Sequence, residues 1–192
     1  MKTKAKIVRL FLEDTKPKTI REISHALHID YRLTYIAIQR LIVENVIQAQ
    51  TVGKSSLCSL NSFYYGLEIY RAENERKEQV LKNKDLRQIC TEIFSKVNTS
   101  FFILLLFGSY AKGTAAQHSD FDLMFVSNEK DFEERVSTIV SLIPLKTHTL
   151  VFKEGDFIRM KNARKSNVVH EAIEHNIVLY GIEAYYKIKN AG

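Results

Sequence analysis

A buried-strand pattern that runs into a glycine, a serine and two closely spaced aspartates is the part of this sequence most able to carry chemistry. The apolar run at residues 101–107 suits a central strand covered on both sides, and it ends at Gly108 and Ser109. A short helix that begins there would turn backbone amides toward an anion such as a triphosphate, and glycine would allow close approach. This turn therefore predicts a phosphate site.

Asp120 and Asp122 stand at the opening of a second apolar strand. Because side chains alternate along a strand, we expect both carboxylates on the same face. Two adjacent carboxylates repel each other, so this placement is unfavourable unless a divalent cation neutralises them. Mg²⁺ that bridges to phosphate oxygens is the natural candidate, and the pair therefore predicts metal-assisted phosphate chemistry.

The order of these features resembles the DNA polymerase beta nucleotidyltransferase superfamily. The pattern is a buried strand, Gly-Ser, a glycine four residues after the serine, and Ser-Asp-x-Asp entering a second apolar strand. It is similar in particular to the minimal nucleotidyltransferases of bacteria and archaea. The resemblance covers residues 84–192, including KSNVVHEAIEHNIVLYGIEAYY, which is similar to the closing helix and short strand of those proteins. It implies an α/β (α+β) domain with a mixed sheet.

The resemblance also implies roles for the matching positions. Gly108 and Ser109 would bind the β- and γ-phosphates, and Asp120 and Asp122 would ligate Mg²⁺. Lys112 would add positive charge to the phosphate site or else remain a solvated helical lysine. The substrate would be a nucleoside triphosphate, with ATP expected, and the acceptor would attack the α-phosphorus in line as pyrophosphate leaves.

One position departs from the family pattern. Active members carry a third carboxylate on the next core strand, which here is expected at residues 146–152. The aligned position is His148, which is a poor Mg²⁺ ligand but can act as a base when neutral. Glu154 shares strand parity with His148 and is the alternative, although Gly155 indicates that the strand is already ending.

The N-terminal segment carries the start and stop signals of three short helices. Residues 3–13 show a helical apolar face, and residues 19–22, Thr-Ile-Arg-Glu, form a capping box that begins a second helix. Asp30 is the expected N-cap of a third helix, and Asn45 is the expected left-handed residue that ends it. Its buried face would include Leu33, Ala37 and Leu41.

A hairpin is expected directly after these helices. The alternation across residues 46–52, a turn at Gly53 and Lys54, and a second run to Leu60 are typical of two antiparallel strands. The order of three helices and a hairpin resembles the winged-helix family of transcriptional regulators over residues 1–62. That resemblance implies that DNA is contacted by Tyr31, Arg32, Thr34, Tyr35, Gln39 and, at the wing tip, Lys54. The alternative is a dimerisation or protein-docking module.

Charge is distributed unevenly along the chain. Residues 1–62 hold ten Lys/Arg against five Asp/Glu, whereas residues 99–192 hold eleven of each. A basic segment joined to a neutral one is typical of a polyanion-binding module attached to a separate function. We therefore expect three parts, namely a winged helix-turn-helix domain at 1–62, a helical linker at 63–83 and a nucleotidyltransferase domain at 84–192.

The sequence lacks the features of a zinc protein, a disulfide-stabilised protein or a membrane protein. Cys58 and Cys90 have no neighbours at metal-ligand spacing, so neither a zinc site nor a disulfide framework is expected. No apolar run reaches membrane-spanning length, and charges interrupt the N-terminal apolar residues. The sequence therefore predicts a cytoplasmic protein that makes no membrane contact.

Two functions remain open after these observations. The first is a Mg²⁺-dependent nucleotidyltransferase, coupled to DNA binding, that transfers a nucleoside monophosphate to a protein, an RNA end or a small molecule. By resemblance it would be antitoxin-like, with a partner toxin as acceptor. The second is a non-catalytic transcription regulator whose degenerate nucleotidyltransferase domain senses a nucleotide or mediates oligomerisation. A homodimer is expected in either case, because winged-helix proteins commonly pair to read two half-sites.

Overall fold

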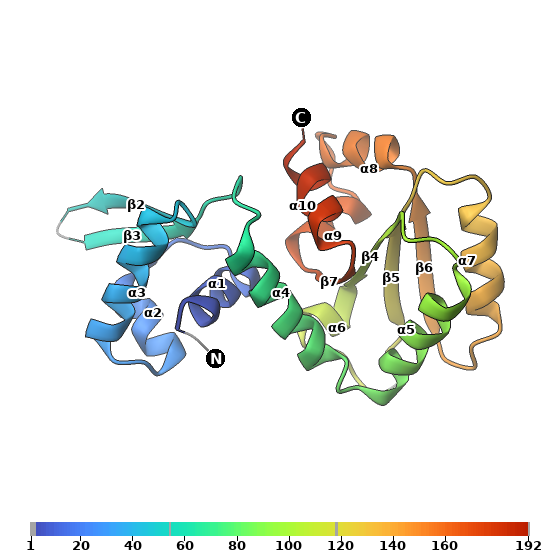
Figure 1. Ribbon diagram of the computed structural model, residues 1–192, viewed down its shortest axis with the longest axis horizontal. Coiled ribbons are helices and arrows are strands. Elements are labelled where there is room, and N and C mark those ends of the chain that lie inside the picture. Colours follow the sequence, from blue (N-terminus) through green and yellow to red (C-terminus); the bar gives the residue numbers. More distant parts are fainter. Residues whose placement is uncertain (1–2, 54, 118, 192) are drawn as a thin grey trace. The chain divides into compact units, whose positions relative to one another are not determined.

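The chain folds into two compact units, which are described separately. The computed structural model describes residues 3–53, 55–117 and 119–191. The first unit is Met1–Glu75 and the second is Arg76–Gly192, so that the division falls within helix α4 (Leu67–Val80) (Figure 1). Within the described ranges, no helix is both long enough and apolar enough to cross a lipid bilayer.

The N-terminal unit contains helices and a small antiparallel sheet in which β3 lies between β1 and β2. The helices and the hairpin expected from the sequence are confirmed. The elements are α1 (Thr3–Glu13), β1 (Lys18–Thr19), α2 (Ile20–Leu27), α3 (Tyr31–Val43), β2 (Ile47–Val52) and β3 (Ser55–Leu60).

Local capping fixes where α2 and α3 begin. The Thr19 hydroxyl accepts from the Glu22 amide while the Glu22 carboxylate accepts from the Thr19 amide, which confirms the capping box. The Asp30 carboxylate accepts from the first free amides of α3, as expected of an N-cap. Asn45 has a φ of 58°, so the chain leaves α3 through the predicted left-handed residue.

The buried face of α3 differs from the sequence-based expectation at one position. Ala37 and Leu41 are buried as predicted, but Leu33 is 57% exposed. Thr34 and Ile38 are buried in its place, because the buried stripe of α3 advances through positions 34, 37, 38 and 41. Apolar periodicity misplaced the start of the stripe, since a threonine with a bonded hydroxyl occupies the first buried position.

The second unit is built on a four-stranded sheet with strand order β6-β5-β4-β7, and this sheet is mixed, as the family resemblance implied. β4 pairs antiparallel with both β5 and β7, whereas β5 and β6 run parallel. The strands are β4 (Ile103–Phe107), β5 (Phe121–Val126), β6 (Thr147–Phe152) and β7 (Ile177–Tyr180). The helices are α5 (Lys84–Lys96), α6 (Gly108–Lys112), α7 (Phe132–Ser141), α8 (Glu154–Lys161), α9 (Val168–Glu174) and α10 (Ile182–Asn190).

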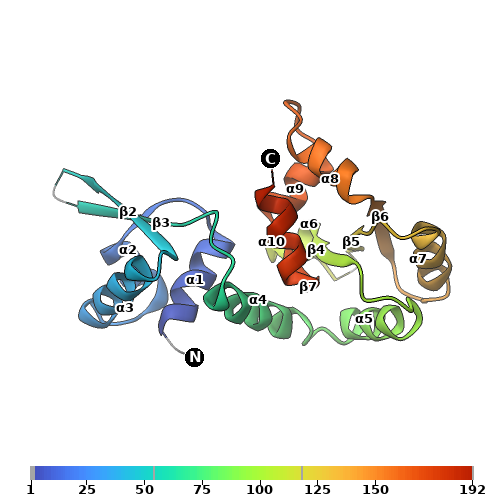
Figure 2. The ribbon, with the colours of Figure 1, turned by 45° about the horizontal axis from the view of Figure 1, so that its top comes forward.

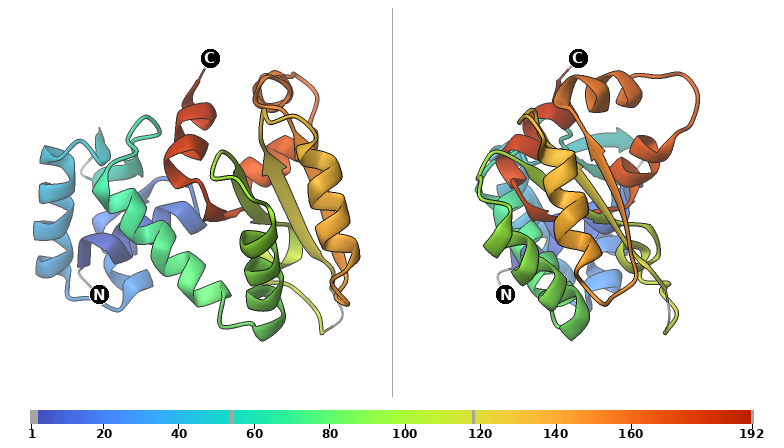
Figure 3. Two further views of the ribbon diagram at one scale, coloured as in Figure 1. Left: turned by 45° about the vertical axis from the view of Figure 1, so that its right-hand side comes forward. Right: turned by 90° about the vertical axis from the view of Figure 1, so that its right-hand side faces the viewer.

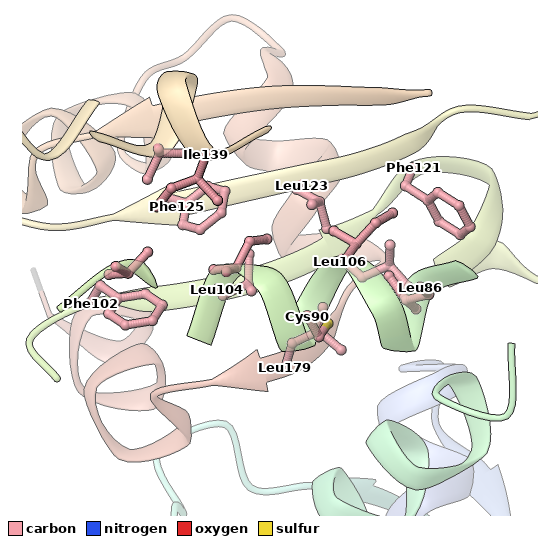
Figure 4. Close-up of a cluster of buried hydrophobic side chains, with 14 of the residues drawn as sticks. Leu86, Cys90, Phe102, Leu104, Leu106, Phe121, Leu123, Phe125, Ile139 and Leu179 are labelled. Atoms are coloured by element: carbon pink, nitrogen blue, oxygen red, sulfur yellow. The ribbon is translucent and has the colours of Figure 1, made fainter. Parts of the chain in front are cut away.

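Helices cover both faces of this sheet. α5 and α7 lie side by side over one face, and α8, α9 and α10 lie on the other side of the strands (Figures 2 and 3). Figure 4 shows the core under α5 and α7, where Leu86 of α5 lies near Leu106 of β4 and Cys90 of α5 lies near Leu179 of β7. β4 is buried at every position, which confirms that the apolar run is a central strand. This burial places the end of β4, where the glycine and serine follow, on a rigid support.

Candidate functional site

The chain turns sharply where β4 ends. Gly108 has a φ of +67° and begins α6, and Gly113, with a φ of +71°, ends that helix after five residues. Residues with a side chain rarely adopt a positive φ, so glycine is favoured at both positions. Ser109 is half-buried directly after the turn. The helix expected to begin at Gly108 is therefore present.

Gly108 also makes room for Asp122. A Cβ atom added at Gly108 would lie 2.0 Å from Oδ2 of Asp122, far inside the contact distance of the two atoms. The Asp122 carboxylate therefore lies directly against the Gly108 backbone. Phe107, the residue before this glycine, is the register partner of Asp122 in the antiparallel pair of β4 and β5. The glycine is required here for space as well as for its backbone conformation.

His148 lies beside Asp122 on the next strand. The parallel register of β5 and β6 pairs Asp122 with His148, and their Oδ1 and Nδ1 atoms are 3.3 Å apart. Phe107, Asp122 and His148 thus form one row across three strands, and aligned residues of neighbouring strands share a face. The His148 side chain is 58% exposed and that of Asp122 is 27% exposed. The row therefore presents a histidine and a carboxylate together at the surface.

Asp120 is not part of this row. β5 begins at Phe121, so Asp120 lies in the preceding loop and strand alternation does not fix its direction. A turn in which Ser119 and Ala116 bond to each other leads into this position, and Asp120 itself is exposed. Among the residues that the structure describes, no three His, Cys, Asp or Glu side chains gather closely enough to hold a metal ion.

The donors at this end of the sheet nevertheless suit a hard divalent cation. No lysine or arginine in the described ranges pairs with either carboxylate. Among the described residues, the His148 ring is the one hydrogen-bonding partner of the Asp122 carboxylate, and none donates to the Asp120 carboxylate. Mg²⁺ prefers carboxylate oxygens and usually retains several waters, so two aspartates suffice as protein ligands. Asp120 and Asp122 would hold such an ion, because they are carboxylates without a protein cation to balance them.

Two other residues considered from the sequence are engaged elsewhere. Lys112, at the end of α6, forms an ion pair of 2.7 Å with Glu171 of α9. Glu154 begins α8 beyond the far end of β6, and its carboxylate accepts from the Asn128 amide group. The suggestion that Glu154 replaces the third carboxylate is therefore wrong, since the length of β6 separates it from Asp122.

The residues predicted to contact DNA fall into three groups. Tyr31, Arg32, Tyr35 and Gln39 are exposed on α3, and the two tyrosine rings stack with their centroids 6.5 Å apart. Thr34 is fully buried and its hydroxyl donates to the Asp30 carbonyl oxygen at 3.0 Å, so the expectation that its side chain faces DNA is corrected. Lys54 lies outside the described residues.

Comparison with known proteins identifies the second unit. The second unit combines a mixed sheet, a Gly-Ser turn and the row of Asp122, and a family match assigns it to the nucleotidyltransferase class of domains. The family model described as "Polymerase beta, Nucleotidyltransferase" matches residues 88–184, just over half of the chain, and the chain belongs to this family. No curated protein and no solved structure matches it.

Proposed function

We propose that this protein is a Mg²⁺-dependent nucleotidyltransferase that transfers a nucleoside monophosphate from a nucleoside triphosphate to an acceptor hydroxyl. The proposal rests mainly on one observation, namely that the Asp122 carboxylate lies against Gly108 and beside His148 in a chain of this family. ATP is the expected nucleotide. The two aspartates close in sequence, the Gly-Ser turn and the family membership all favour the same chemistry.

Each residue of the site has a proposed task. Gly108 and Ser109 contact the β- and γ-phosphates, and Asp120 and Asp122 hold Mg²⁺, which when bound neutralises charge on the phosphates. Lys112 is engaged by Glu171 in an exposed ion pair, so a bound phosphate would share its ammonium group with Glu171 or replace Glu171 as its partner.

His148 supplies the proton acceptor in this proposal. Its Nδ1 is 3.3 Å from the Asp122 carboxylate, which favours the tautomer with the proton on Nδ1. Nε2 then carries the lone pair, and no described residue occupies it. The acceptor oxygen forms a bond to the α-phosphorus, the bond from this phosphorus to the bridging oxygen breaks, pyrophosphate leaves, and the hydroxyl proton passes to Nε2.

A second function has one observation in its favour. By the family resemblance, His148 aligns with the third carboxylate of active members, and a histidine is a weak ligand for Mg²⁺. The rival proposal is a transcription regulator whose nucleotidyltransferase domain binds a nucleotide, or mediates oligomerisation, without transfer. Retention of both aspartates and of Gly108 favours the enzyme, since oligomerisation alone needs no carboxylate seated against a glycine.

Calorimetric titration with each of the four nucleoside triphosphates, with and without Mg²⁺, tests the nucleotide site. We expect at least one nucleotide to bind in a Mg²⁺-dependent way, because the aspartates need a cation before they can approach phosphate oxygens. Binding that persists unchanged after removal of the metal would contradict the assigned roles of Asp120 and Asp122. No binding at millimolar nucleotide would favour the regulator in which this domain serves oligomerisation.

We further propose that the N-terminal unit is a winged helix-turn-helix domain that binds DNA as a homodimer. Three helices, an antiparallel sheet and an exposed α3 that carries Arg32 and Gln39 support this assignment. Arginine and glutamine are the side chains that read guanine and adenine edges in the major groove. The excess of basic residues in 1–62 supplies attraction to phosphates.

Changing Arg32 to alanine tests this second proposal. Duplex DNA affinity should fall steeply with rising salt, and Arg32→Ala should lower affinity by about tenfold, as loss of one base or phosphate contact does. Fluorescence anisotropy with a labelled duplex over a salt series measures both effects. Arg21→Ala, on the exposed side of α2, is the matched control and should change little. Salt-insensitive binding, or none, would instead favour a protein-docking module.

A further inference from the structure

β6 forms an open edge of the four-stranded sheet. It pairs with β5 on one side only, since the strand order ends at β6. The Phe121 amide donates to the Lys146 carbonyl and the Ser127 amide donates to the Phe152 carbonyl, so even-numbered residues of this segment turn toward β5. Backbone groups alternate in direction along a strand, and those of Thr147, Thr149 and Val151 therefore point outward.

The outward groups of β6 have no partner in the described part of the chain. No turn, cap or side chain in that part bonds to the N–H or C=O of Thr147, Thr149 or Val151. α7 packs with α5 and also contacts β6 (Figure 3), but in the described ranges no backbone hydrogen bond joins α7 to β6. A row of unpaired donors and acceptors is a template for another polypeptide strand.

The β6 edge also lacks the usual protection against such pairing. The sequence of β6, Thr-His-Thr-Leu-Val-Phe, has no lysine, proline or glycine, and all six residues pair with β5 in unbroken register. Edges that must stay unpaired are usually short, charged or irregular. β7, at the opposite edge, fits that description, because it has four residues and a register shift against β4. Of the two edges of this four-stranded sheet, β6 is therefore the longer and more regular one.

The open edge begins at the candidate site. His148 belongs to β6 and is the register partner of Asp122. A strand added to β6 would lie about 4.8 Å further along the sheet and would extend the row of Phe107, Asp122 and His148 by one position. Its side chain in that row would stand next to the His148 ring, on the same face as the Asp122 carboxylate.

We propose that the acceptor of this enzyme is an extended polypeptide segment that pairs with the outer edge of β6 and presents a hydroxyl side chain beside His148. The inference rests on the proposed function, and it selects a protein over RNA and small molecules as acceptor. Only a polypeptide backbone repeats donors and acceptors at the two-residue spacing of this edge. Pairing through the backbone gives affinity, and the row position gives the site of transfer.

Two substitutions at Thr149 separate this edge from the nucleotide site. Thr149→Pro removes an outward N–H that bonds to nothing in β5, and proline is tolerated on the outer side of an edge strand. Thr149→Val keeps the N–H and the side-chain shape, and it is the matched control. Neither substitution alters Gly108, Ser109 or the aspartates. Both variants should therefore bind ATP and Mg²⁺ with the same affinity as the original chain.

Peptides selected from a random phage-displayed library against the full chain provide the probe. We expect them to slow amide hydrogen exchange at Thr147, Thr149 and Val151. We also expect them to bind Thr149→Val as they bind the original chain and Thr149→Pro at least about tenfold more weakly. Equal binding to Thr149→Pro, or exchange slowed only elsewhere, would overturn the proposal. The proposal would also be overturned if the amides of this edge were already protected from exchange in a dimer and Thr149→Pro dissociated that dimer. The strand paired with β6 would then belong to a second copy of this chain. A chain that binds edge peptides but no nucleotide would instead refute the proposed function.

Discussion

Replacing Asp122 with asparagine is expected to abolish nucleotidyl transfer while leaving the fold intact. Asparagine has the same shape, so the packing against Gly108 persists, but its neutral amide is a poor replacement for a carboxylate that neutralises a divalent cation. Loss of one charge-stabilising group from an active site typically lowers the rate about 10²- to 10³-fold. Thermal stability should change little, since asparagine keeps the shape of the side chain and its place against Gly108.

Incorporation of label from an α-labelled nucleoside triphosphate measures this effect, and thermal unfolding checks the fold. The control is Asp156→Asn, because Asp156 pairs with Arg159 in α8, away from the row. Asp120→Asn should also abolish labelling if both aspartates hold the cation. Retained labelling in the double variant Asp120→Asn/Asp122→Asn would refute the site assignment. If labelling is lost in Asp122→Asn but not in Asp120→Asn, Asp120 is a loop residue that takes no part in catalysis.

Sequence reasoning succeeded where the determinant is local. The capping box of Thr19 and Glu22 and the Asp30 N-cap act over three residues or fewer, so their helix starts could be predicted from residue type and spacing. The central strand at β4 was equally clear, because five consecutive buried positions leave no polar alternation. The family pattern around Gly108 and Asp122 then indicated that the sheet is mixed, whereas the order of its strands came from the structure.

Features that depend on distant parts of the chain were missed or misplaced. Lys112 and Glu171 are 59 residues apart, and nothing in either neighbourhood signals their ion pair. Leu33 and Thr34 exchanged their expected environments, because the direction of α3 is set by the helices it packs on and a threonine can satisfy its hydroxyl locally. The row of Asp122 and His148 required the register of β5 on β6, which sequence can suggest only through the family pattern.

The seating of Asp122 against Gly108 explains why this turn needs a glycine. The Asp122 carboxylate lies beside His148 because β4, β5 and β6 pair in this register and the chain turns at Gly108. Gly108 contributes through the absence of a side chain, which leaves space for the carboxylate. The position of Asp122 is therefore set by backbone geometry rather than by a hydrogen bond from a lysine or arginine.

Replacing Gly108 with alanine is expected to abolish nucleotidyl transfer, because the added methyl group would displace the Asp122 carboxylate. Alanine at a φ of +67° costs about 1–2 kcal/mol of backbone strain, and its Cβ would lie 2.0 Å from Asp122 Oδ2. The carboxylate must then rotate away from the turn and from His148. We expect the transfer rate to fall by about a hundredfold or more, and Mg²⁺-dependent nucleotide binding to weaken with it.

Gly113→Ala is the matched control for this change. Gly113 has a φ of +71°, so the backbone strain is similar, but an added Cβ has no atom within 4 Å. Gly113 also ends the same helix that Gly108 begins, and both variants should therefore lose similar amounts of stability from backbone strain. Label incorporation should survive in Gly113→Ala and disappear in Gly108→Ala. If both variants lose activity in proportion to stability, the turn acts only through the integrity of α6. If both retain it, the carboxylate does not need its place against Gly108, and the metal and phosphate roles assigned to this end of the sheet are incorrect.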